Sequence, residues 1–387
     1  MNLEEYPELA YINPNNLSRV LRLNNFHSKI KDEMFSPNGE SQILDGDWDL
    51  DLSISFEKLD VFESIYSHFI ENKSWNKTSL YSRVSGEILD NKIKWGCKTP
   101  EEYLNRLNEN IDSLYIDIKN NGFKTQNELG SSKTSDEVRV AIDRNGQVIF
   151  MDGRHRLAIA KILKLEKIPV KIILRHAKWV EFQKTVFQYA KSDSRGKIYQ
   201  LIEHPDLDFI PAHHKDDRFD FLEKSIIDYD CHNKNLIDIG THWGHMSHKF
   251  EDLGFKCTAI EKLESNIHYL RHIRNACEKN FDIWQGDVFD YPDIEKMDLI
   301  LALNIFHHFC KTEELHEKFV KLLNRIDAEI MLFQAHRHDP PGQMEGAFRN
   351  YNEIEFVKFI SKHTGLNMWE KLGVAADKRP IYKLWKS

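Results

Sequence analysis

The chain has 387 residues, a hydrophobic fraction of 41% and a formal net charge of -8 at pH 7. This length and apolar content suffice for two or three hydrophobic cores. No apolar run approaches the roughly 18 residues of a membrane-spanning helix, and the first residues lack the basic and then apolar order of a signal peptide. We therefore expect a cytoplasmic protein with no membrane span.

Residues 1–76 are predicted to form an acidic segment to which the sequence assigns no role. Its first 75 residues hold 14 acidic and 6 basic side chains, which accounts for the whole net charge. Because an acidic surface repels a phosphate backbone, nucleic acid is not an expected partner. The acidic run at 45–51 has the spacing of a cation-binding loop, but the closing Glu of a calcium loop is out of register, which favours a solvated turn.

A strand, a tight turn and the start of a helix follow one another near the middle of the chain. The strand ends at Asp152 and Gly153, and the first helical turn holds Arg154, His155 and Arg156. The free N–H groups and positive dipole of a helix N-terminus attract anions, and arginine adds hydrogen bonds suited to phosphate. The pattern predicts a phosphate or nucleotide site. The alternative is that the arginines are surface charges beside an ordinary turn.

This region, residues 77–180, resembles the ParB and sulfiredoxin superfamily, whose members carry a similar glycine, histidine and arginine turn that holds nucleotide phosphates. The resemblance implies an α+β domain that binds ATP or CTP with Mg²⁺. Members include free-serine kinases, nucleotide hydrolases and sulfinic-acid reductases. The reductase activity is excluded, because Arg154 stands where its cysteine belongs. For a kinase, Glu128 and Glu137 are candidate bases, and the sequence does not decide between them.

Residues 181–217 are expected to form a helical linker, after which strands and helices alternate to the end of the chain. Helical spacing marks residues 245–254, 262–280 and 311–326. The four strands between and beside them end in polar residues, and in an open parallel sheet such ends meet at one ligand-binding edge. In chain order these ends are Asp238, Glu261, Asp287 and Asn304.

On this pattern, residues 218–387 resemble the class I S-adenosylmethionine-dependent methyltransferases. The resemblance implies a Rossmann-like doubly wound sheet with S-adenosylmethionine as cofactor. Glu261 would then hold the ribose diol and Asp287 the adenine amino group, while a nicotinamide-binding sheet is the alternative. His242 replaces the middle glycine of the commonest form, so its side chain must point away from the cofactor or cover it. The expected cofactor contacts are Asp238, Gly240, His242, Gly244, Glu261, Asp287 and Asn304.

The methyl acceptor is expected between residues 304–308 and 334–344, because both segments leave strands at the same edge. His307 is the candidate catalytic base, since a neutral imidazole can accept a proton near neutral pH. The alternative is that His307 and His308 only cap the following helix or pack beneath the loop. A fifth strand is predicted at 329–334, a helix at 352–363 and a closing hairpin at 376–385 that ends on an antiparallel edge strand.

The sequence therefore predicts an α/β enzyme that methylates a small-molecule or glycan acceptor and carries an N-terminal nucleotide- or phosphate-binding module. Two alternatives remain open. One is a ParB-like small-molecule kinase whose methyltransferase fold is regulatory, and the other is a non-enzymatic nucleotide-binding module. No metal site is predicted, because His242, His245 and His248 recur at helical spacing without a further ligand.

Overall fold

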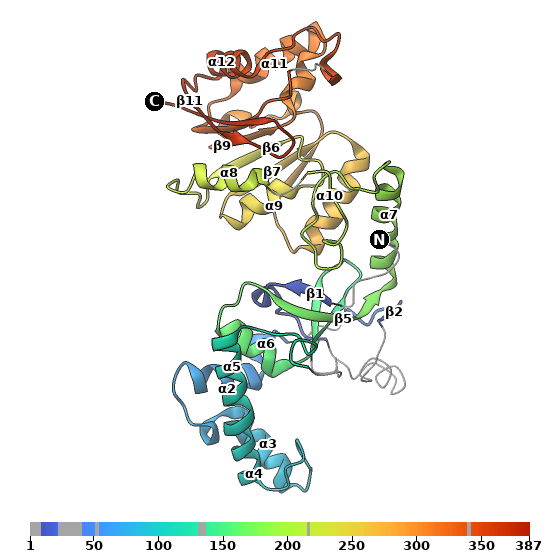
Figure 1. The fold of residues 1–387 in the computed structure, drawn as a ribbon, viewed down its shortest axis with the longest axis vertical. Coiled ribbons are helices and arrows are strands. Elements are labelled where there is room, and N and C mark those ends of the chain that lie inside the picture. The colour runs from blue at the N-terminus through green and yellow to red at the C-terminus, as the bar shows by residue number, and fades with distance from the viewer. Residues whose placement is uncertain (1–8, 22–40, 51–53, 131–136, 215–216, 339–341) are drawn as a thin grey trace. The chain divides into compact units, whose positions relative to one another are not determined.

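The chain forms two compact units, Met1–Phe187 and Gln188–Ser387. The computed structural model describes residues 9–21, 41–50, 54–130, 137–214, 217–338 and 342–387 (Figure 1). Parts of several sequence predictions lie outside the described residues: positions 1–8, 22–40 and 51–53 of the acidic segment and its acidic run, 131–136 of the ParB-like region, 215–216 of the linker, and 339–341 of the expected acceptor loop.

The described residues of the first unit contain a mixed five-stranded sheet. Its strands are β1 (Leu9–Ile12), β2 (Gln42–Leu44), β3 (Val138–Ile142), β4 (Val148–Asp152) and β5 (Ile168–His176). β5 pairs with parallel β3 on one side and with antiparallel β1 and parallel β2 on the other, and β3 and β4 form an antiparallel hairpin. Because β3 and β5 have neighbours on both sides, nearly all their residues are buried.

Helices complete the first unit. They are α2 (Asp60–Phe69), α3 (Ser79–Leu89), α4 (Pro100–Arg106), α5 (Asp112–Asn121), α6 (Arg154–Ile162) and the part of α7 (Ala177–Ser192) up to Phe187, with a π-helical turn at Leu107–Ile111. α6 connects β4 to β5 and packs against α2. Thr78 and Thr99 cap α3 and α4 by accepting hydrogen bonds from their first turns, which explains where these helices begin.

The acidic segment is part of the first unit, so the predicted boundary near residue 76 does not separate two folded bodies. β1 and β2 precede that position and pair with β5. Arg19 forms an ion pair with Asp143 at 3.0 Å, and Lys161 of α6 pairs with Glu57 at 2.6 Å. Strands of four and three residues are too short to leave a periodic signal in the sequence.

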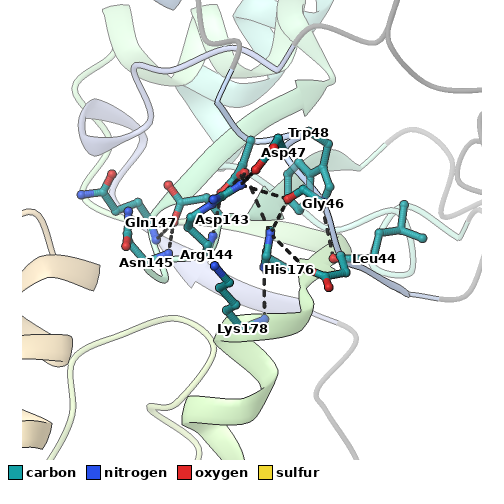
Figure 2. Close-up of polar contacts among 12 residues, drawn as sticks. Leu44, Gly46, Asp47, Trp48, Asp143, Arg144, Asn145, Gln147, His176 and Lys178 are labelled. Carbon is teal, nitrogen blue, oxygen red and sulfur yellow. Dashed lines mark hydrogen bonds and ion pairs between the residues drawn. The ribbon is translucent and has the colours of Figure 1, made fainter.

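The described part of the acidic run, residues 45–50, binds an arginine of the same unit (Figure 2). Arg144, in the turn between β3 and β4, donates to Asp49 at 2.6 Å, to Asp47 at 2.7 Å and to the carbonyl of Gly46 at 2.9 Å. His176, which is fully buried, contacts the same carbonyl at 2.8 Å. The described part of this run therefore binds the β3–β4 turn through Arg144. It is neither a cation loop nor a purely solvated turn.

The second unit contains a seven-stranded sheet in the order β11-β12-β10-β9-β6-β7-β8. The strands are β6 (Asn235–Ile239), β7 (Lys256–Glu261), β8 (Asp282–Gln285), β9 (Leu299–Leu303), β10 (Ile330–Gln334), β11 (Met368–Val374) and β12 (Pro380–Trp385). β6 to β10 are parallel, while β12 is antiparallel to both β10 and β11. The order reverses at β6, so the sheet is doubly wound and has its switch point between β6 and β9.

Helices cover both faces of this sheet. They are α8 (Asp217–Ser225), α9 (His245–Asp252), α10 (Glu264–Ala276), α11 (Glu313–Arg325) and α12 (Glu353–Thr364). One core contains residues of α8, α9 and α10, and the other contains residues of α11 and α12. The predicted α/β fold class and doubly wound sheet are confirmed by these three layers (Figure 1).

Two details of the second half differ from prediction. The linker is helical only to Ser192, the end of α7, and residues 193–214 contain no further helix. The closing hairpin is formed by β11 and β12, and the edge strand is β11 rather than the final strand. β11 was missed because its apolar and charged residues fall in blocks, Met368 and Trp369 and then Glu370 and Lys371, without the alternation that marks a strand, and most of them are exposed.

Candidate functional site

The turn from β6 into α9 requires glycine at two positions. Gly240 has φ +70°, and a Cβ there would lie 2.8 Å from the side chain of Ile305. Gly244 has φ +88°, and its Cβ would lie 2.6 Å from Leu270. His242 adopts φ +61°, a left-handed conformation that favours glycine and that histidine tolerates better than most residues. The turn thus brings backbone close to the strand edge.

Asp238, at the end of β6, organises this turn from beneath. It is buried and accepts hydrogen bonds from the hydroxyls of Thr241 at 2.6 Å and Ser247 at 2.8 Å. Burial raises the pKa of its carboxyl group, and the two hydroxyl bonds oppose that shift. The side chain therefore fixes the turn to the first residues of α9.

Glu261 ends the neighbouring strand β7 and is also buried. One carboxylate oxygen accepts from the backbone N–H of His242 at 3.0 Å, and the other accepts from that of Leu263 at 2.8 Å. Each carboxylate oxygen can accept a second hydrogen bond, so both remain able to bind a diol. The two backbone bonds orient the side chain before any ligand arrives.

Asp287 follows β8 and caps a short 3₁₀ turn by accepting from the N–H of Phe289 at 3.2 Å. Its other oxygen pairs with Lys262 at 2.8 Å. Asn304 follows β9 with φ +59°, and the structure leaves both polar atoms of its buried side chain without a hydrogen-bond partner among the described residues. An amide in this state costs about 1 to 3 kcal/mol unless a ligand satisfies it.

These strand ends surround one cavity of about 550 Å³. Of the seven predicted cofactor contacts, six line it and Gly244 does not, because Gly244 packs against Leu270. Leu263, which is 58% exposed, and Ile305 supply apolar lining that could hold a planar ring. The six predicted residues that line the cavity are Asp238, Gly240, His242, Glu261, Asp287 and Asn304.

Sequence reasoning missed Arg218 of α8, which also lines the cavity. The side chain is 4% exposed and donates to Gln334 at 3.3 Å, while its Nε has no partner among the described residues. Burial lowers its pKa. Tyr199 and Gln200, from the segment before α8, line the cavity too. Their position was the one indication in the sequence, because the segment before the first strand of such a sheet often covers the bound cofactor.

The candidate base His307 does not line the cavity, whereas its neighbour His308 does. Both lie in a 3₁₀ helix, η9 (Phe306–Cys310), which turns the two rings differently. His307 is buried, and this burial lowers its pKa to about 2. An imidazole with so low a pKa binds a proton weakly and is a poor general base. The assignment of His307 as the base stays a prediction.

The residues that line the cavity include partners for the polar groups of S-adenosylmethionine. Carboxylates at Glu261 and Asp287 suit a diol and an amino group, and the buried guanidinium of Arg218 suits a carboxylate. Arg218, Asn304 and His242 each have a buried polar atom that finds no partner among the described residues. Burial also lowers the pKa of His242 to about 4, so this ring is neutral near neutral pH. The residues present therefore fit the cofactor that the sequence predicts.

The first unit has a separate cavity of about 600 Å³ at the start of α6. All five predicted phosphate contacts line it: Asp152, Gly153, Arg154, His155 and Arg156. The helices contribute Arg83 of α3 and Tyr103 of α4 to its wall, and Trp95 lies 4.8 Å from the ring of His155. Desolvation lowers the pKa of His155 to about 4.

The two arginines of this motif have different environments. Arg156 is buried, pairs with Glu137 at 3.1 Å and places its guanidinium 4.3 Å from the ring centre of Phe123. Arg154 is exposed and has no hydrogen bond or ion pair with the described residues. Arg156 thus stabilises the fold, and Arg154 is the arginine that remains available for a ligand.

Neither candidate kinase base is free in this unit. Glu137 is buried and accepts from Arg156 and from the N–H of Gln126 at 2.6 Å. Glu128 accepts from the N–H and hydroxyl of Thr125 at 2.7 and 2.8 Å, and it does not line the cavity. Both carboxylates therefore have structural roles in this arrangement.

The described residues contain neither a cluster of metal ligands nor a helix that could cross a membrane. Nowhere in that part of the chain do three His, Cys, Asp or Glu side chains converge in a way that could hold a metal ion. None of the helices described combines the length and the apolarity that a membrane crossing demands.

No protein-family model matches the chain, and no curated protein matches it. Similar solved structures include the bifunctional kinase-methyltransferase WbdD, with 18% identity over 51% of this chain and 46% of that one and a TM-score of 0.39. The match thus spans less than half of the WbdD chain. At such low identity the likeness says nothing about the reaction of this chain.

Two smaller methyltransferase structures are also similar. One is an S-adenosylmethionine-dependent methyltransferase from Clostridium acetobutylicum ATCC 824, with 12% identity over 43% of this chain and 90% of that one and a TM-score of 0.36. The other is the methyltransferase domain of bacterial CtHen1, with 13% identity over 44% and 98% and a TM-score of 0.34.

Proposed function

We propose that residues 188–387 bind S-adenosylmethionine and transfer its methyl group to a small-molecule or glycan acceptor. The observation that carries this proposal is the cavity at the switch point, where carboxylates at two strand ends and a buried arginine surround unpartnered polar atoms. A buried polar group without a partner is costly, so a ligand that supplies those hydrogen bonds binds favourably there.

Different residues of the cavity would bind different parts of the cofactor. Arg218 would bind its carboxylate, Glu261 the ribose diol and Asp287 the adenine amino group. When bound, S-adenosylmethionine supplies an electrophilic methyl group. The chain itself holds donor and acceptor in line and excludes water, which is the main contribution that a displacement of this kind needs.

Isothermal titration of the full chain with S-adenosylmethionine tests this proposal. The parent should bind, and Glu261→Ala should weaken binding roughly tenfold to a hundredfold, because it removes charged hydrogen bonds worth about 1.5 to 3 kcal/mol. Glu264→Ala is the matched control, since Glu264 is a nearby exposed carboxylate that does not line the cavity. No binding by the parent, or equal affinity in Glu261→Ala, would overturn the assignment.

A second proposal concerns the first unit, which we infer binds a nucleotide or another phosphorylated ligand at the start of α6. Its support is the 600 Å³ cavity, into which the N-terminus of α6 and the available Arg154 open. ATP and CTP, each with Mg²⁺, are the ligands to titrate. Arg154→Ala should weaken binding at least tenfold, and equal binding by this variant would return the residue to a surface role.

The same titration, followed by a measurement of phosphate transfer, separates the kinase from the non-enzymatic module. Phosphate transfer from ATP to a small molecule would favour the kinase, and nucleotide binding without turnover would favour a non-enzymatic module. Because Glu128 and Glu137 are both engaged in structural hydrogen bonds, binding without transfer is the outcome that this cavity supports best.

A further inference from the structure

A two-residue turn places a tryptophan at the cavity of the first unit. The turn joins Lys94 to Cys97, whose backbones exchange hydrogen bonds of 2.8 and 3.3 Å. Its central residues, Trp95 and Gly96, have φ +51° and φ +76°. Positive φ at both positions is characteristic of a type I′ turn, which favours Asn or Gly at the first of them. A bulky tryptophan there is disfavoured, so the turn carries backbone strain that a smaller residue would avoid.

Burial of the tryptophan does not offset this strain. Trp95 is 43% exposed, although tryptophan side chains are on average highly buried. Its ring lies 4.8 Å from that of His155, at an interplanar angle of 49°, and 6.2 Å from that of Tyr103. All three side chains line the cavity of about 600 Å³. The turn therefore exposes an aromatic ring to the same cavity as the phosphate motif.

The three residues that open α6 differ in what they offer a ligand. Arg156 is already paired with Glu137, whereas Arg154 is exposed and available. Desolvation, together with the charge of Arg154, lowers the pKa of the His155 imidazole to about 4, so this ring is neutral near neutral pH. A neutral imidazole brings no charge to a phosphate. By its contacts His155 belongs with Trp95 in an aromatic wall.

The cations beside this wall are balanced by acids. Arg83 contacts Asp60 at 2.5 Å and Glu87 at 2.9 Å, and Lys94 also pairs with Glu87. Two carboxylates thus face two cations. A region with so little excess charge suits an uncharged ring better than a phosphate, which is attracted to positive potential.

We infer that Trp95 and His155 form a stacking subsite for a nucleobase, so that the ligand of this cavity is a nucleotide whose phosphates contact Arg154. The inference rests on the site proposed for the first unit, and it selects a nucleotide over phosphorylated ligands without an aromatic ring. Aromatic side chains stack with any nucleobase, because every base has a π-face. Arg154 and His155 are consecutive in the first turn of α6, so the phosphate contact adjoins the ring contact along the chain.

Calorimetric titration of the full chain with CTP, ATP and inorganic tripolyphosphate, each with Mg²⁺, tests the inference. Glu261→Ala is the background, so that the adenine site proposed in the second unit contributes less. Trp95→Ala should weaken CTP and ATP binding roughly tenfold to a hundredfold, because it removes a stacked ring, and should leave tripolyphosphate binding unchanged. Trp95→Phe keeps a ring and should retain most of the affinity. Trp369→Ala is the matched control, since Trp369 is exposed on β11 of the second unit.

Variants of the motif separate ring contacts from phosphate contacts. His155→Asn should weaken binding of the nucleotides and not of tripolyphosphate, whereas Arg154→Ala should weaken all three. If Trp95→Ala binds nucleotides as the background chain does, the stacking subsite is overturned while the phosphate site stands. Equal losses of nucleotide and tripolyphosphate in Trp95→Ala would also overturn it, because the tryptophan would then support the cavity wall. If the background chain binds none of the three probes, the proposed phosphate site fails and the inference fails with it.

Discussion

The two cavities contain similar residue types but use them differently. Around the cavity of the second unit, buried polar atoms of Arg218, Asn304 and His242 have no hydrogen-bond partner within the part of the chain that the structure describes. In the first unit, the most conspicuous motif residue, Arg156, already bonds Glu137 and packs on Phe123. A motif therefore indicates where a site lies, whereas hydrogen-bond satisfaction indicates which of its residues can contact a ligand.

The largest expected effect comes from Arg156→Ala. Removing this partner leaves Glu137 buried and uncompensated, which costs about 3 to 5 kcal/mol. We expect the free energy of unfolding of the first unit to fall by that amount, as measured by urea denaturation. Arg154→Ala is the control, and its stability should match the parent. Equal stability of the two variants would show that the arginines have equivalent roles. The contrast between a structural Arg156 and an available Arg154 would then be wrong.

Stability of the second unit should fall as the pH is lowered below about 6.5. Burial lowers the pKa of His248 to about 3 and that of His307 to about 2, so both rings stay neutral in the folded state while they protonate in the unfolded chain. The unfolded state then binds more protons, and each ring removes about 1.4 kcal/mol per pH unit below its unfolded value. Urea denaturation between pH 7 and 5 measures the slope, which should become shallower in His248→Gln.

Arg218→Gln should weaken binding of S-adenosylmethionine roughly tenfold or more, because it removes a buried charge from the carboxylate end of the cavity. Calorimetry with S-adenosylmethionine and with adenosine makes this prediction specific. Adenosine lacks the carboxylate, so its affinity should be the same in parent and variant. If the variant loses both ligands in equal proportion, Arg218 supports the fold rather than the cofactor.

The smallest expected effect is that of Lys262→Ala. Lys262 pairs with Asp287 at the cavity rim, but its side chain is 69% exposed, and exposed ion pairs contribute about 0 to 1 kcal/mol. Affinity for S-adenosylmethionine should therefore change less than about fivefold. A larger loss would mean that Lys262 itself contacts the ligand.

The sequence could predict the strand-end residues because their positions follow from local pattern. Asp238, Glu261, Asp287 and Asn304 lie at or just beyond the ends of predicted strands, and parallel strands bring such ends to one edge. Arg218 lies before the first strand of the sheet, and nothing in its local sequence states that α8 carries it to the cavity. Its role depends on tertiary packing.

The same limit applies to the histidines and to the first unit. Whether His307 or His308 faces the cavity depends on the 3₁₀ geometry of η9, which spacing alone does not reveal. The partnership of Arg156 with Glu137 joins residues nineteen positions apart across a turn. The short strands β1 and β2 left no periodic signal, so the acidic segment could not be assigned to the sheet before the structure was known.

The most direct test of the central claim is a crystal structure of the full chain with S-adenosylhomocysteine. We expect the ligand in the cavity of the second unit, with its carboxylate hydrogen-bonded to Arg218, its ribose diol to Glu261 and its adenine amino group beside Asp287. A ligand bound elsewhere, or bound in this cavity with its carboxylate away from Arg218, would show that the proposed site is wrong.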